Sequence, residues 1–153
     1  MKKLEKSGNI LNWLCLAAMG GLIVAQFLPY WHLDGGSIGL QQFIWLPDAF
    51  RDLKDYFVQS VGSFDINSFV GLPILTFAVA IGGVVVCVLA HDQFWASLCP
   101  ILCGAVGIYI YTADPYLALG VPCGVHLALC IMILALGIAL AAVRLTQLFL
   151  NKD

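Results

Sequence analysis

Residues 33–68 read LDGGSIGLQQFIWLPDAFRDLKDYFVQSVGSFDINS, and this stretch decides how the rest of the chain is interpreted. It holds every charged residue between Lys6 and Asp92, namely Asp34, Asp48, Arg51, Asp52, Lys54, Asp55 and Asp65. The sequence on both sides is strongly apolar and almost free of charge. The stretch is therefore the one part large enough to form a structure outside a lipid bilayer.

The composition of the 153-residue chain excludes an ordinary water-soluble domain. Hydrophobic residues make up 61% of the chain and charged residues only 10%, whereas a soluble domain has roughly a quarter charged residues. So few charges cannot cover a surface in water, which predicts one compact membrane domain over residues 1–153, with the lipid bilayer as a partner. The net charge of −2 provides no basic surface for nucleic acid.

Four apolar runs predict transmembrane helices at about residues 10–31, 69–89, 94–112 and 121–149. The first run would measure about 33 Å as a helix, enough to cross a hydrocarbon core of about 30 Å. The turn at residues 90–93 is so short that the second and third helices must form an antiparallel hairpin. The fold class expected is an all-α integral membrane protein, a four-transmembrane-helix bundle with an ordered outer segment between the first two helices.

The fourth run is longer than the hydrocarbon core requires. We expect its last turns, with Arg144 and Gln147, to project beyond the membrane. Pro100 in the third run predicts a kink or a locally broken first turn, because proline cannot donate the backbone hydrogen bond of a helix interior.

Lysine and arginine are distributed unevenly between the two ends of the predicted helices. One side holds Lys2, Lys3, Lys6, Arg144 and Lys152, and the other holds only Arg51 and Lys54. The excess of basic residues indicates the cytoplasmic side. We therefore expect both termini in the cytoplasm, residues 33–68 outside, and a location in the plasma membrane, with the bacterial cytoplasmic membrane as the preferred setting.

The outer segment carries enough apolar side chains to be ordered. It is expected to contain a glycine-rich turn, a short extended piece around residues 43–45 and an amphipathic helix over about residues 47–61. Its candidate interaction surface consists of Phe43, Trp45, Phe50, Leu53 and Phe57. Apolar residues at this density must be buried against something, which leaves three alternatives: a lid on the protein's own helix ends, a docking surface for a partner, or a lid over a ligand pocket.

Few residues in the predicted helices could carry chemistry, and no catalytic, metal or cofactor site is predicted. The candidate polar sites within the membrane or at helix ends are His32, His126 and Asp114. His126 is interpreted first as a hydrogen-bonding group between helices. The six cysteines are interpreted as small packing residues, because most of them fall inside apolar runs. The sequence has no Cys-x-x-Cys pair of the kind that membrane thiol oxidoreductases generally present.

The layout resembles the claudin-type plan of four spanning helices, with inner termini, a larger first outer loop and a smaller second one. Pro29 and Trp31, followed by Gly39, Leu40 and Trp45, are similar to the tryptophan-bearing start of that loop. The paired loop cysteines of claudins are absent and the loop is shorter. The resemblance is one of topology and implies no activity.

The function expected from these features is that of a non-enzymatic accessory or assembly subunit of a membrane complex. It would act through its helix faces and its outer segment, with other membrane subunits or further copies of itself as partners. The alternatives are a small oligomeric channel or transporter and, third, a membrane redox or haem protein.

Overall fold

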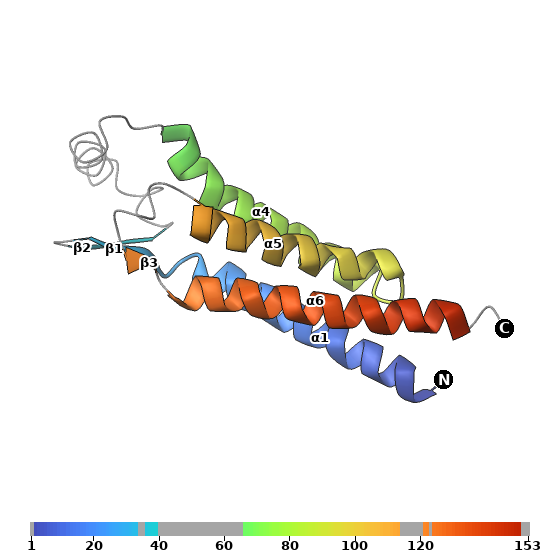
Figure 1. The fold of residues 1–153 in the computed structure, drawn as a ribbon. Coiled ribbons are helices and arrows are strands. Elements are labelled where there is room, and N and C mark those ends of the chain that lie inside the picture. Colours follow the sequence, from blue (N-terminus) through green and yellow to red (C-terminus); the bar gives the residue numbers. More distant parts are fainter. Residues whose placement is uncertain (1, 34–35, 40–65, 114–120, 123, 151–153) are drawn as a thin grey trace.

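The computed structural model describes residues 2–33, 36–39, 66–113, 121–122 and 124–150. Its elements, in chain order, are α1 (Lys2–Ala25), β1 (Pro29–Leu33), β2 (Gly36–Gly39), α4 (Ile66–Leu89), the 3-10 helix η1 (Phe94–Ser97), α5 (Leu98–Ala113), β3 (Val121–Pro122) and α6 (Gly124–Leu150) (Figure 1). Four helices therefore account for most of the described chain. Two segments, Leu4–Ala25 and Gly124–Leu150, are long and apolar enough to cross a membrane.

The four helices pack side by side in a closed arrangement. α1 lies against both α4 and α6, and α5 lies against the same two helices. α1 begins and α6 ends at the same side of the molecule, where the chain termini lie (Figure 1). The predicted hairpin of the second and third helices is confirmed, because α4 and α5 pack together across the turn at residues 90–93.

Each helix buries a single stripe of residues whose spacing alternates between three and four. The stripe on α6 is the clearest example and consists of His126, Cys130, Ile133, Gly137, Leu140 and Arg144. The corresponding stripe on α1 consists of Gly8, Asn12, Cys15, Met19 and Leu22 and continues to Gln26, the residue after the helix, with Ala18 and Ala25 buried beside it. A mean spacing of 3.5 residues keeps one side of a helix facing its neighbours, as in a left-handed coiled coil.

Small residues in these stripes let α5 and α6 approach closely. A Cβ atom added at Gly104 would lie 2.6 Å from the backbone nitrogen of Leu134 and 2.7 Å from the carbonyl oxygen of Cys130. From the other helix, a Cβ at Gly137 would lie 2.9 Å from the backbone nitrogen of Ile101. Glycine is therefore required for the observed distance between these two backbones.

A three-stranded antiparallel sheet lies at the end of the helices opposite the termini (Figure 1). The strand order is β2-β1-β3, with His32 opposite Ser37 on one side and Val121 on the other. The sheet joins the segment that follows α1 to the segment that precedes α6.

Three predicted helix boundaries are wrong. The first helix was expected to begin at about residue 10 and begins at Lys2. It was also expected to continue to residue 31 and ends at Ala25 instead, because Pro29 disfavours helical geometry in the residue before it and cannot donate to the helix. The fourth was expected to begin at residue 121, but residues 121–122 pair with β1 and α6 begins at Gly124. The third helix opens with the 3-10 turn η1, and Pro100 lies in the first turn of α5.

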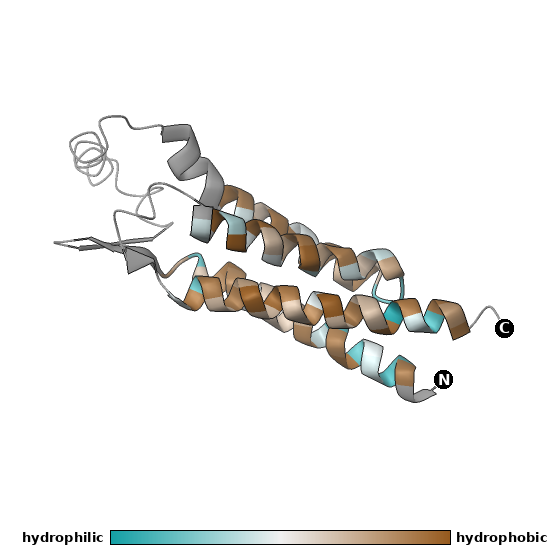
Figure 2. Ribbon diagram, viewed as in Figure 1, coloured by the Kyte–Doolittle hydropathy of each residue, from teal (hydrophilic) through white to brown (hydrophobic). Residues whose placement is uncertain are grey.

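The outer surface of the helices is apolar. Large hydrophobic side chains point away from the other helices along all four, among them Trp13, Ile81, Val85, Leu89, Leu102, Tyr109, Ile131 and Ile138. Figure 2 shows that most residues of the helices are hydrophobic, and that strongly hydrophilic ones gather near the termini and the α4–η1 turn. The buried stripes, by contrast, contain many glycines, alanines, cysteines and polar residues.

Candidate functional site

All five residues predicted to form an interaction surface lie outside the described part of the chain. They are Phe43, Trp45, Phe50, Leu53 and Phe57, and Asp114 lies outside it as well. The predicted extended piece and amphipathic helix of the outer segment fall there too. His32 is placed by its backbone only, in the central strand β1.

His126 lies in the first turn of α6 and is completely buried. Its Nε2 donates a hydrogen bond to the carbonyl oxygen of Ala25 at 2.6 Å. That oxygen belongs to the last turn of α1, where helix geometry leaves carbonyl groups without partners within the helix. His126 therefore ties the start of α6 to the end of α1, in agreement with the interhelical hydrogen bond expected for it.

Arg144 is buried near the end of α6, with only 5% of its surface exposed. Its expected place on turns of α6 beyond the membrane stays a prediction, but its burial was not foreseen. It is buried because it continues the buried stripe of α6, four residues after Leu140. Gly8 of α1 leaves room for it, since a Cβ there would lie 3.4 Å from the guanidinium carbon.

The guanidinium of Arg144 joins three parts of the chain. Its Nη2 donates to the carbonyl oxygen of His91 in the α4–η1 turn at 2.5 Å, and to Oδ1 of Asn9 in α1 at 3.4 Å. Its Nη1 donates to Oε1 of Gln147 at 3.1 Å. The carboxylate of Asp92 lies 3.8 Å from Nη2 and 2.9 Å from Nε2 of His91. One side chain thus connects α6, α1 and the turn between α4 and α5.

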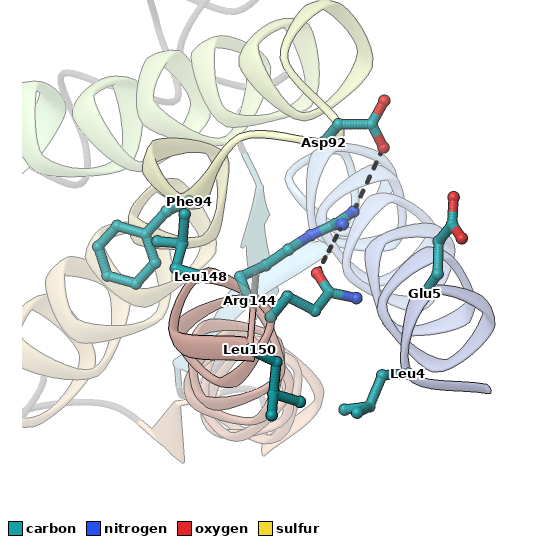
Figure 3. Close-up of a pocket in the computed structure, with 8 residues that line it drawn as sticks. Leu4, Glu5, Asp92, Phe94, Arg144, Leu148 and Leu150 are labelled. Atoms are coloured by element: carbon teal, nitrogen blue, oxygen red, sulfur yellow. Dashed lines mark hydrogen bonds and ion pairs between the residues drawn. The ribbon is translucent and has the colours of Figure 1, made fainter. Parts of the chain in front are cut away.

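A cavity of about 310 Å³ lies beside this arginine. Its polar lining consists of Glu5, Asp92, Arg144 and Gln147, and its apolar lining of Leu4, Phe94, Leu148 and Leu150. Figure 3 shows Arg144 reaching from α6 toward Asp92 of the turn, with Glu5 on the neighbouring helix α1. The cavity therefore combines charges of both signs with an apolar wall.

Four further buried polar residues were not singled out from the sequence: Asn12, Gln26, Thr76 and Ser97. Asn12 donates from Nδ2 to the carbonyl oxygen of Cys87 at 3.3 Å, which joins α1 to α4. The spacing along the chain could have indicated the burial of three of them. Asn12 and Gln26 follow the 3.5-residue spacing of the buried stripe of α1, and Thr76 follows that of α4. Buried polar groups of this kind orient helices by directional hydrogen bonds.

The described cysteines are free thiols in or beside the buried stripes: Cys15, Cys87, Cys99, Cys103 and Cys130. The thiol of Cys87 donates to the carbonyl oxygen of Ala96 at 3.4 Å, which fixes α4 against η1. Within the described residues, no three histidine, cysteine or acidic side chains converge as metal ligands would. The cysteines thus act there as small packing residues.

Comparison with protein-family models, curated proteins and solved structures finds no match for this chain. The residues themselves therefore carry the functional argument.

Proposed function

We propose that the chain is an integral membrane protein with four spanning helices that acts as a non-enzymatic accessory or assembly subunit. The observation that carries the proposal is the apolar outer surface of the packed helices. Leu89, Trp95 and Tyr109 are exposed by 79%, 69% and 69%, respectively. In water such a surface would drive aggregation, because large contiguous apolar patches are rare on soluble proteins. In a bilayer the acyl chains cover it.

The lengths of all four helices are compatible with spanning. α1 and α4 each have 24 residues, or about 36 Å, and the 27 residues of α6 extend about 40 Å. η1 and α5 together, with 4 and 16 residues, add up to about 32 Å. Each exceeds the hydrocarbon core of about 30 Å.

The orientation we propose places both termini in the cytoplasm. Lys6 and Arg144 lie near the helix ends that carry the termini, and the basic residues Lys2, Lys3 and Lys152 belong to the same two ends of the chain. The sheet β2-β1-β3 and residues 40–65 would then belong to the outer side of a plasma membrane.

An outward face of α4 supports a role in assembly. Ala78 and Gly82 are exposed and lie four residues apart, and no atom of another residue lies within 4 Å of a Cβ built at Gly82. Small residues at this spacing permit a second helix to approach closely in lipid. A helix of a partner subunit, or of another copy of the chain, would fit this face.

Purification in a mild detergent followed by native mass spectrometry tests the assembly role. We expect the chain in a defined complex, and the substitution Gly82→Leu should weaken that complex while leaving the monomer folded. Ala135→Leu, at an exposed small residue of α6, is the matched control and should leave the complex intact. Recovery of free monomer alone, with a transport or catalytic activity of its own, would contradict the proposal.

A further inference from the structure

The cavity beside Arg144 has a lining whose charges match neither a simple anion nor a simple cation. A guanidinium, that of Arg144, and two carboxylates, those of Asp92 and Glu5, line the same cavity. A free anion attracted by the arginine would be repelled by both acids. A free cation attracted by the acids would be repelled by the arginine. A ligand that carries one negative and one positive charge can pair with the arginine and with the acids at the same time.

Arg144 has more hydrogen-bond donors than its printed contacts use. A guanidinium has five N–H groups, and the bonds to Gln147, Asn9 and His91 engage three of those of Arg144. Arginine binds phosphate oxygens through charge-assisted and frequently bidentate hydrogen bonds.

The apolar wall adds a second requirement. Leu4, Leu148 and Leu150 line the same cavity at the end of the helices that carries the termini. A cavity of about 310 Å³ is at the small end of the range for ligand sites. It suits a head group better than a whole lipid, and the leucines lie where the first carbons of the acyl chains would continue.

We propose that this cavity binds the head group of an ethanolamine phospholipid from the inner leaflet. The phosphate would accept hydrogen bonds from Arg144, and the primary ammonium would donate to the carboxylates of Glu5 and Asp92. An ammonium has three N–H donors, whereas the quaternary nitrogen of choline has none. This inference rests on the proposed function, because it requires the cavity to face the membrane interface.

Native mass spectrometry of the purified full chain tests the site. Ethanolamine, choline and glycerol phospholipids with identical acyl chains are added in equal amounts. We expect the wild type to retain the ethanolamine lipid about threefold more than the choline lipid, the size of a partly exposed charge interaction. Equal retention of these two lipids, or a preference for the anionic glycerol lipid, would overturn the inference.

Glu5 and Lys6 are exposed neighbours on α1, so substituting either of them does not disturb buried packing. Glu5→Gln removes one ammonium partner and should reduce the preference for the ethanolamine lipid. Lys6→Gln removes a charge that does not line the cavity and should leave the preference unchanged. An equal loss of preference in both variants would show that general surface charge, and not a specific site, determines lipid retention.

A parallel alkaline wash of membranes separates the two proposals. Release of the chain into the supernatant would contradict the proposed membrane insertion. Retention in the membrane without an ethanolamine preference would contradict the lipid site alone.

Discussion

Arg144 shows how a single charged residue can join several elements at the end of the helices that carries the termini. Its guanidinium donates to the carbonyl oxygen of His91, two residues after the end of α4, and to the side chain of Asn9 on α1. A cation beside the last carbonyl groups of a helix is favoured by the partial negative charge there. Its ion pair with Asp92 contributes little, since that carboxylate is 68% exposed. The bond to the His91 carbonyl is the main stabilising contact.

Replacing Arg144 by glutamine should destabilise the protein. Loss of the charge-assisted hydrogen bond to the carbonyl oxygen of His91 is expected to lower the free energy of unfolding by about 2 kcal/mol. Unfolding by a denaturing detergent, followed by circular dichroism, measures the change. Thr146→Ala serves as control, because Thr146 is exposed and bonds only the carbonyl of Ala142 in its own helix. Equal stability of the two variants would contradict the role assigned to Arg144.

His126 should contribute less than Arg144. Substitution by leucine removes the Nε2 donor, but the Ala25 carbonyl still accepts from the backbone nitrogen of Leu28 at 2.9 Å. The expected loss in the free energy of unfolding is about 1 kcal/mol, measured in the same assay. His126→Gln keeps an N–H donor and should recover part of the loss. A leucine variant as stable as the wild type would show that the bond between α6 and α1 is dispensable.

At the scale of the helices, close backbone contact requires glycine at specific positions. Gly104 and Gly82 provide a matched pair, since both lie in helices but only Gly104 contacts a neighbouring backbone. Gly104→Ala would force α5 away from α6 and should lower the free energy of unfolding by about 2 kcal/mol. Gly82→Ala should raise it by about 0.5–1 kcal/mol, because alanine favours the helix. Detergent unfolding of both variants checks the predicted opposite signs.

The sequence was sufficient to predict that the helices exist, but it did not indicate which face of each helix contacts the others. Apolar runs and the short polar turn at residues 90–93 indicated four helices and the α4–α5 hairpin. Hydrophobic periodicity could not assign the faces, because residues such as Ile131 and Ile138 on the outside are as apolar as Ile133 and Leu140 inside. The informative pattern was instead the 3.5-residue spacing of small and polar residues. That spacing extends to Arg144, which explains why it is buried.

The strands at the other end of the helices were missed for a different reason. Residues 29–33 lie at the end of a continuous apolar run and therefore look like the last turns of a helix. Their pairing with residues 121–122 joins segments about 90 positions apart in the chain, and such non-local contacts leave no periodic signal in the sequence. Pro29 was the available local clue, since it favours a helix end before it.

For the whole molecule, the proposed topology predicts where each terminus lies. A fluorescent protein fused to the C-terminus should fluoresce in a bacterial host, and alkaline phosphatase fused at the same place should be inactive, because the fusion point lies in the cytoplasm. Substituting Lys2, Lys3 and Lys6 together by glutamine should weaken this orientation, since basic residues beside the first helix set it. An active phosphatase fusion of the wild type would reverse the assignment of the two sides.

The central claim is that acyl chains cover the outer surface of the helices, and tryptophan quenching by brominated lipids tests it most directly. The four native tryptophans are replaced by phenylalanine, and one tryptophan is placed at Ile138, which is 54% exposed near the middle of α6. In vesicles with bromine deep in the acyl chains, we predict strong quenching, with no quenching by iodide in the water. Quenching by iodide and none by the brominated lipid would contradict the account.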